Sequence, residues 1–368
     1  MRATCMNKEY PLFECEIEGQ YIIKLYETID EKHLPIVLQD NLTLESVNKW
    51  LETRIIPDTR EGIKEARMEF SFENYHNMFS LSDQYWFKYV DKEKWEKLNF
   101  FTNTYHTETG RIFFEPWTVD LRQLRKENPD LTTGGVCRKR WIQDDTKASK
   151  LIKSGSATCG QSPVAEVLTS MMLKKLQVIP FVEYSLTVDG LQICSICDNF
   201  VTKDTEYVPV SQIYFKEKRD KKNETIYAHI VKMAEKYGIP KNKSDEYLQA
   251  MIAVDSMIYN TDRHLNNFGF IRNVKTGKLV DYAPLFDSGS AFFDTKENAA
   301  MFKKQEQKAL DKMRIRIENR DIDFSDMIHL VKTFPTISDE DKEFIVHRIE
   351  RSKAKVVKIL SKADVGER

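Results

Sequence analysis

The amino-acid sequence predicts a mixed α+β fold in which a strand-rich region is followed by a helical region. Short segments rich in β-branched and aromatic residues, separated by turns with Gly or Asp, are concentrated between residues 126 and 205. Segments with apolar residues three and four positions apart, the spacing of one helix face, are concentrated between residues 206 and 368. Residues 1–125 form a further N-terminal α+β subdomain, so we expect three parts.

The N-terminal subdomain contains both strand and helix patterns. Apolar and acidic residues alternate over residues 13–17, and a second strand pattern over residues 21–26 completes a predicted hairpin. Helical spacing follows over residues 43–54 and again over residues 60–70. Residues 80–117 are crowded with aromatic side chains among charges of both signs. We therefore expect a core or domain interface there, in preference to a surface that stacks on nucleic-acid bases.

The middle part combines strands with one helix. Residues 132–145 and 149–155 have the pattern of two strands joined by a short polar turn. Ser162 is expected to cap a helix over residues 162–176, with Pro in the first turn, where its missing N–H costs nothing. The Asp-Gly pair at 189–190 predicts a hairpin turn.

The last part is mainly helical. Residues 244–260 place apolar side chains on one stripe, which predicts an amphipathic helix. Residues 270–282 have the pattern of a hairpin with a Thr-Gly turn, and residues 339–362 that of a long charged amphipathic helix. A loop and a hairpin therefore separate the helices of this part.

Composition narrows the classes of function. The chain carries 56 Lys and Arg against 57 Asp and Glu, whereas a dedicated nucleic-acid binder usually has a strongly basic balance, so we expect no direct nucleic-acid binding. The absence of a bilayer-length apolar run and of a secretion signal predicts a cytoplasmic protein without membrane contact. We interpret Cys194 and Cys197, in a strand-like setting, as two buried thiols and not as a zinc or redox site.

The residues that indicate chemistry lie in segment 260–270 and one hairpin beyond it. Phosphoryl transfer from ATP requires an aspartate that orients the attacking hydroxyl and accepts its proton, and oxygen ligands that hold magnesium against the phosphates. Asp262 and Asn267 have the spacing of the base and the metal-binding Asn in protein kinase catalytic loops. Asp287 can bind the metal from a second side. His264 can stabilise the transferring phosphoryl group or brace the loop.

An isolated D-x-x-x-x-N pattern is more often a capped turn after a helix, with Asp and Asn present for local hydrogen bonds. Here the pattern follows an amphipathic helix, continues into a strand and is followed by Asp287 after one hairpin. This context favours phosphoryl transfer. We expect Gly289 to allow the turn that redirects the chain after Asp287.

This segment resembles the HipA-like serine/threonine kinase family, whose catalytic loop reads D-x-H-x-x-N-F and is followed by a hairpin that ends in P-x-x-D. The matching residues are Asp262, His264, Asn267, Phe268, Pro284 and Asp287. The resemblance is most specific there and extends back to about residue 131. It implies a two-lobed protein-kinase-like fold with a strand-rich N-lobe at 126–205 and a helical C-lobe at 206–368.

The resemblance also implies roles for individual residues. Asp262 resembles the general base, and Asn267 and Asp287 resemble the magnesium ligands. Lys153 stands where the family has a strand lysine that touches the ATP phosphates; the alternative is an exposed strand lysine. Glu166 can pair with Lys153, or it is simply a first-turn glutamate favoured by the helix dipole.

Further residues of the strand-rich part are expected to contact ATP. Gly134, Gly135 and Val136 occupy the position of the phosphate-covering loop, whose backbone N–H groups can bind phosphate. In the family this loop can carry an autophosphorylated serine, a role that Thr132 or Thr133 could take here. Ser195 and Cys197 belong to the expected hinge that faces adenine, and Asp198 is expected to reach the ribose.

The sequence therefore predicts an ATP- and Mg²⁺-dependent kinase that phosphorylates a Ser or Thr hydroxyl on itself or on another protein. The string D-R-H-x-x-N also occurs in phosphoinositide kinases, so a lipid substrate is the first alternative. No polybasic stretch supports it, because acidic residues interrupt the basic run 216–222. The other alternative is a toxin-like protein or pseudokinase that acts mainly by binding, since family members can be held by a DNA-binding antitoxin.

Overall fold

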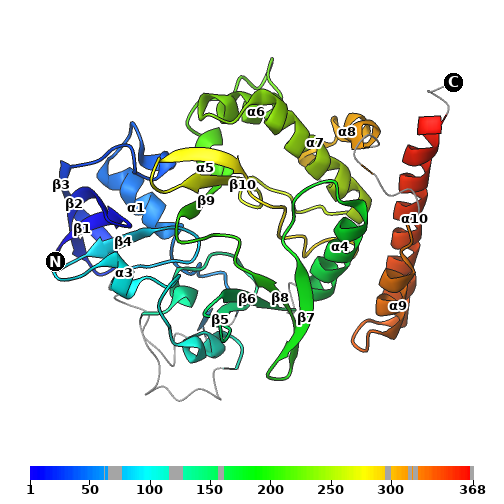
Figure 1. The fold of residues 1–368 in the computed structure, drawn as a ribbon, viewed down its shortest axis with the longest axis horizontal. Helices are drawn as coiled ribbons and strands as arrows, with labels where there is room; N and C mark the ends of the chain where they lie inside the picture. The colour runs from blue at the N-terminus through cyan, green and yellow to red at the C-terminus, as the bar shows by residue number, and fades with distance from the viewer. Residues whose placement is uncertain are drawn as a thin grey trace. The chain divides into compact units, whose positions relative to one another are not determined.

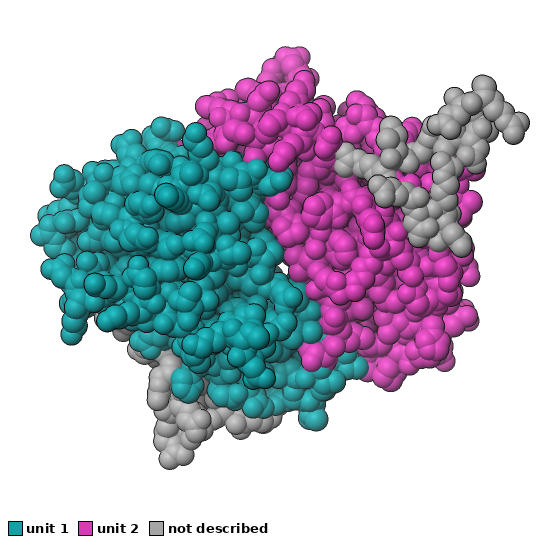
Figure 2. All heavy atoms as spheres, viewed as in Figure 1, with its two compact units in different colours: residues 1–158, 188–208, 270–281 teal, residues 159–187, 209–269, 282–368 magenta. Residues whose placement is uncertain are grey.

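The computed structural model divides into two compact units, which Figure 2 distinguishes by colour. Unit 1 comprises residues 1–158, 188–208 and 270–281, and unit 2 comprises residues 159–187, 209–269 and 282–368. The structure describes residues 1–61, 63–64, 77–115, 127–155, 161–294, 300–313, 317 and 322–364. The chain passes between the units several times, so they do not follow the three consecutive parts expected from the sequence, and that division stays a prediction.

Unit 1 begins with an antiparallel four-stranded sheet in the order β3-β2-β1-β4 (Figure 1). Its strands are β1 (Arg2–Asn7), β2 (Tyr10–Glu18), β3 (Tyr21–Thr28) and β4 (Tyr85–Lys88). The predicted hairpin is confirmed as β2 and β3, and Gly19 takes the positive φ of 60° that their turn requires.

Helix α1 (Leu44–Glu52) confirms the first predicted helix and packs its apolar face into the core of this sheet. Thr43 caps the helix, since its side chain accepts a hydrogen bond from the backbone N–H of Ser46 and the Ser46 hydroxyl accepts one in return. Most of the second predicted helix, residues 60–70, falls outside the described residues.

A second four-stranded sheet has the order β5-β6-β8-β7. Its strands are β5 (Lys139–Gln143), β6 (Ser149–Ser154), β7 (Tyr184–Asp189) and β8 (Gln192–Asp198). Short helical segments precede it: α3 (Trp95–Leu98), η2 (Thr107–Phe113) and η5 (Pro129–Thr132), with η1 (Ile36–Leu38) near the first sheet. The aromatic stretch is confirmed as core, because Trp86, Trp95 and Phe100 are buried in one cluster together with Trp141.

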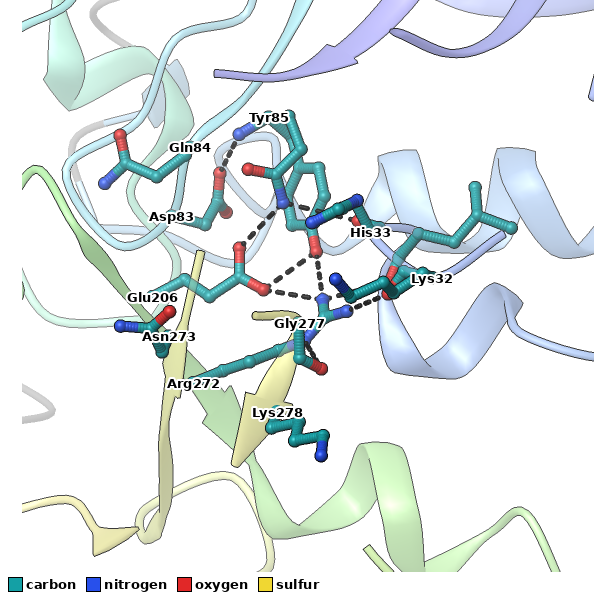
Figure 3. Close-up of polar contacts among 12 residues, drawn as sticks. Lys32, His33, Asp83, Gln84, Tyr85, Glu206, Arg272, Asn273, Gly277 and Lys278 are labelled. Atoms are coloured by element: carbon teal, nitrogen blue, oxygen red, sulfur yellow. Dashed lines mark hydrogen bonds and ion pairs between the residues drawn. The ribbon is translucent and has the colours of Figure 1, made fainter. Parts of the chain in front are cut away.

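A three-stranded sheet, in the order β11-β10-β9, contains β9 (Thr205–Pro209), β10 (Gly269–Asn273) and β11 (Lys278–Tyr282). A buried ion pair between Glu206 and Arg272 joins β9 to β10, and hydrogen bonds from Arg272 connect both strands to the N-terminal segment of unit 1 (Figure 3). Arg272 donates hydrogen bonds to Glu206 Oε1 at 2.7 Å, to the Tyr85 hydroxyl at 2.8 Å and to the backbone carbonyls of Lys32 and Leu34. This cluster anchors the strand that directly continues the candidate catalytic loop.

Unit 2 contains most of the helices: α4 (Ser162–Leu176), α5 (Val210–Tyr214), α6 (Ile226–Lys236), α7 (Lys241–Ile258), α8 (Glu306–Met313), α9 (Ser325–Thr333) and α10 (Asp339–Asp364), with η6 (Ala300–Phe302) before α8. The amphipathic helices expected near 244–260 and 339–362 are confirmed as α7 and α10. The predicted cap at Ser162 was wrong by one position: α4 begins at Ser162, and Gln161 is its N-cap without a side-chain hydrogen bond. Among the described residues, each helix is too short or too polar to cross a bilayer.

Helix α10 braces the C-terminal end of α7, which leads into the candidate catalytic loop. The Ser352 hydroxyl donates to the carbonyl of Met257, and Lys355 Nζ donates to the carbonyl of Ser256 at 2.9 Å. These carbonyls belong to the last turn of α7, where cations and donors are favoured.

The two cysteines with a sequence expectation are confirmed as buried free thiols, Cys194 and Cys197, and Cys5 and Cys15 are buried free thiols as well. Cys137 is disulfide-bonded.

Candidate active site

The candidate catalytic loop connects α7 to β10 within the pattern that the sequence predicts. Helix α7 ends at Ile258, and its C-cap residue, Tyr259, takes a left-handed conformation with φ of 56° and donates its N–H to the carbonyl of Asp255. The loop then runs to Phe268, whose carbonyl accepts a hydrogen bond from the backbone of Val210 at 3.0 Å. A helix end and the first residues of α5 therefore fix the loop at both sides.

Arg263, to which sequence reasoning gave no role, joins the two segments that carry the predicted metal ligands. Arg263 is 2% exposed, and its guanidinium makes two hydrogen bonds of 3.0 Å with the two carboxylate oxygens of Asp255. It also donates to the carbonyls of Asn267 and Phe286, each at 2.7 Å. Phe286 directly precedes Asp287, so one buried cation holds the loop and the following segment together.

Asp255 is the centre of a wider polar network. Its Oδ1 accepts a hydrogen bond from Asn260 Nδ2 at 2.8 Å, and Asn260 Oδ1 accepts one from the Ser290 hydroxyl at 2.7 Å. A capped turn would need only local bonds, whereas these bonds reach a segment thirty residues further along the chain. Sequence reasoning missed this network. The feature that could have indicated it is Asp255, an acidic residue on the mainly apolar stripe of α7.

Two residues shape the turn at Asp287. Asp287 itself has a positive φ, 58°, which is rarely adopted outside Gly and indicates a backbone held by its surroundings. Gly289 lies in the turn that follows, where the backbone N–H of Ala291 donates to the carbonyl of Ser288 at 3.0 Å. Gly289 also allows a close approach to the start of α4, because a Cβ atom there would lie 2.9 Å from Ser162 Oγ and 3.0 Å from Ser162 Cβ.

Electrostatics at Asp262 suit a proton acceptor. Asp262 is exposed as a residue, yet partial burial of its carboxyl group raises the pKa, and the carboxylates of Asp287 and Asp294 raise it further. His264 and Arg263 act in the opposite direction. A base with a pKa moved toward neutrality transfers protons more effectively near physiological pH. Asp294, which the Thr261 hydroxyl contacts, is an acidic residue of this site that sequence reasoning missed.

His264 takes part in the loop itself. Its Nδ1 accepts a hydrogen bond from the backbone N–H of Asn266 at 3.2 Å, which supports the bracing role over a role toward the phosphoryl group. The hydroxyl of Ser211 in α5 donates a hydrogen bond to Oδ1 of Asn266 at 2.5 Å. The loop is thus tied to its neighbours on both sides of Asn267.

The predicted metal ligands offer oxygen atoms of the kind that magnesium prefers. Asn267 is buried, and its Nδ2 donates to the carbonyl of Asp262 at 3.0 Å, so its Oδ1 is the atom left to bind a cation. Asp287 supplies a carboxylate. Within the described ranges no three His, Cys, Asp or Glu side chains converge on one point, so nucleotide phosphates and water would have to complete an octahedral shell.

The nucleotide-binding residues expected around Lys153 lie on the second sheet of unit 1. Lys153 is 8% exposed and stands directly opposite Ser195 in β8 and Lys139 in β5. Cys197 is two residues from Ser195, so it shares that face of the sheet. Asp198 lies on the other face, where it makes an ion pair of 2.6 Å with Lys150. The sheet therefore brings Lys153, Ser195 and Cys197 together but not Asp198.

The expected phosphate-covering loop follows η5. Gly134, Gly135 and Val136 are exposed, and Gly135 has a φ of 96°. The Thr132 hydroxyl is buried and donates to the carbonyl of Phe79 at 2.8 Å, an arrangement that disfavours it as a phosphate acceptor. The Thr133 hydroxyl donates to the carbonyl of Pro129 at 2.7 Å.

The remaining predicted residue, Glu166, is buried in the first turns of α4 in unit 2. Lys153 belongs to unit 1, and the pairing of the two residues stays a prediction.

Comparison with known proteins gives one family and several similar folds. Residues 131–358 match the HipA-like C-terminal domain. HipA of Shewanella oneidensis MR-1, solved with HipB and operator DNA, is 12% identical, with a TM-score of 0.57 over 98% of this chain and 97% of that chain. The Helicobacter pylori proinflammatory kinase CtkA is 16% identical, with a TM-score of 0.49 over 62% of this chain and 94% of that chain. No curated protein matches. The likeness to HipA confirms the predicted α+β, kinase-like fold class.

Proposed function

Because the chain belongs to the HipA-like family, we propose that it is an ATP-dependent serine/threonine protein kinase. The observation that carries this proposal is the set of bonds made by Arg263. One guanidinium binds the backbone carbonyls of Asn267 and Phe286, and thereby holds the segments of both predicted metal ligands beside Asp262. Phosphoryl transfer depends on such positioning, since the protein has little covalent chemistry of its own to do.

In the proposed reaction, Asp262 orients the hydroxyl of a Ser or Thr side chain and accepts its proton. A bond forms between the hydroxyl oxygen and the γ-phosphorus of ATP, and the bond from that phosphorus to the β–γ bridging oxygen breaks, which releases ADP. Asn267 and Asp287 would hold magnesium, which supplies positive charge against the phosphates. Lys153 would bind the α- and β-phosphates.

The other nucleotide contacts follow the family. The loop Gly134–Val136 would cover the phosphates, the strand at Ser195 and Cys197 would face adenine, and Glu166 would position Lys153. Asp198 would need to leave its ion pair with Lys150 to reach a ribose. Autophosphorylation stays part of the proposal, with Thr133 preferred over the buried Thr132.

A protein partner is also proposed. The HipA structure that resembles this chain contains HipB and operator DNA. By family, this chain would act in the cytoplasm and would be held by an antitoxin-like protein. The protein substrate would be bound separately, through the surface around Asp262.

Removal of a metal ligand tests the proposal. The Asp287→Ala variant removes a carboxylate but no core volume, so we expect phosphate transfer from ATP to fall to background while the circular dichroism spectrum is unchanged. Asp339→Ala, at an exposed carboxylate of α10, is the matched control and should retain transfer. Full activity in the Asp287→Ala variant would overturn the assignment of the metal site.

A further inference from the structure

Arg60, from the N-terminal third of the chain, binds the loop that is expected to cover the phosphates. Arg60 is 2% exposed, and its guanidinium donates to three successive backbone carbonyls: Nε to Gly135 at 3.0 Å, and Nη2 to Gly134 at 2.8 Å and to Thr133. The next carbonyl, that of Val136, accepts a hydrogen bond from the backbone N–H of Glu61 at 3.0 Å. Four carbonyl groups in a row are thus engaged by two adjacent residues.

This arrangement determines what the loop presents to solvent. The peptide bonds of the described residues are trans, and in a trans peptide the N–H points away from the C=O of the same unit. Carbonyls directed at Arg60 therefore direct the N–H groups of Gly134, Gly135 and Val136 to the opposite, exposed side. Engagement by a buried cation also removes from that side the oxygen atoms that would repel an anion.

Three N–H groups directed to one exposed side of a loop are the chemistry of an anion-binding site.

We propose that Arg60 is a positioning residue that turns the donors of the Thr133–Val136 loop toward the phosphates of the nucleotide. This inference rests on the proposed function in that it takes ATP as the ligand. It gives the N-terminal third of the chain a specific task, which is to hold the phosphate loop in its binding conformation.

The test measures binding and not transfer, by titration calorimetry of the full chain with ATP, adenosine and inorganic triphosphate. Arg60→Lys keeps the charge but cannot reach three carbonyls. We therefore expect the affinity for ATP and for triphosphate to fall about tenfold, which corresponds to the loss of roughly one to two hydrogen bonds. The affinity for adenosine should be unchanged. Selectivity for the phosphate-bearing ligands is a readout that a purely structural role would not change.

Arg54→Lys is the matched control. Arg54 is also buried in unit 1 and donates to two backbone carbonyls, those of Met78 and Tyr85, but it does not contact the loop. It should lower stability without changing the ratio of ATP to adenosine affinity. Gly135→Ala is a second route to the same result should Arg60→Lys not fold, because alanine is strained at a φ of 96°.

The outcomes separate the two proposals. Wild-type affinity for ATP in both Arg60→Lys and Gly135→Ala, or equal losses for ATP and adenosine, would overturn the inference while the proposed kinase function stood. A wild-type chain that bound none of the three ligands would overturn both. Selective loss of ATP and triphosphate, with Arg54→Lys unchanged in its ratio, supports the inference.

Discussion

A buried carboxyl group just before the phosphate loop gives a quantitative prediction of stability against pH. Asp130, in η5, is fully buried; its Oδ1 accepts a hydrogen bond from the backbone N–H of Trp141 at 2.6 Å, and no donor among the described residues reaches its Oδ2. Burial raises the pKa of Asp130 from 3.8 to about 7, although Arg140 and Arg60 partly oppose the shift.

The sign follows from proton binding in the two states. Between the unfolded pKa and the raised folded pKa, the folded chain retains a proton on Asp130 that the unfolded chain has lost, so the free energy of unfolding falls as the pH rises. In Asp130→Asn this group no longer titrates. The stability of the variant relative to the wild type should therefore increase from pH 5 to pH 8 by about 2–3 kcal/mol, at 1.36 kcal/mol for each unit of pKa difference.

Urea unfolding followed by tryptophan fluorescence measures this difference. All five tryptophans lie within residues 50–141, so the signal reports on unit 1, which contains Asp130. Asp144→Asn is the control: Asp144 is partly exposed, and a hydrogen bond from Thr146 lowers its pKa, so its contribution is lost only at lower pH. An Asp130→Asn advantage that stays constant between pH 5 and pH 8 would refute the reasoning.

Three further predictions concern buried contacts. Arg263→Lys and Arg272→Lys each remove a guanidinium from an almost fully buried residue, so both should lower the melting temperature. Only Arg263→Lys should raise the magnesium concentration needed for half-maximal phosphate transfer. An equal magnesium dependence in the two variants would count against the role of Arg263. Glu206→Gln leaves the Arg272 charge buried without its carboxylate and should cost about 3–5 kcal/mol in urea unfolding, and a cost below 1 kcal/mol would contradict this. Gly289→Ala should cost about 1–3 kcal/mol through its clash with Ser162, and wild-type stability would contradict that packing.

The proposed catalytic residues could be grouped from the sequence alone because they are close to one another along the chain. Asp262 and Asn267 occupy one loop, and a single hairpin brings the chain back to Asp287. The elements on either side of the loop also have strong periodic patterns. The predicted helix before it is present as α7, and the predicted hairpin after it is present as β10 and β11. Local spacing and local periodicity carry this kind of information.

The contacts that hold the site could not be predicted in the same way. Arg60 and Gly135 are separated by 75 residues, and Arg60 binds backbone carbonyls, which every residue type possesses. Glu206 and Arg272 likewise pair across 66 residues. The face on which Asp198 lies depends on the register between β6 and β8, which long-range packing determines. A single sequence contains no local pattern for any of these.

The most direct test of the central claim is phosphate incorporation from ATP labelled at the γ-position, with Mg²⁺, into the full chain and an added protein substrate. We compare the wild type with Asp262→Asn, which keeps the size of the side chain but cannot accept the proton. The account predicts incorporation with the wild type and a loss of at least about 100-fold with the variant, the usual contribution of a general base. Equal incorporation by the two proteins would contradict it.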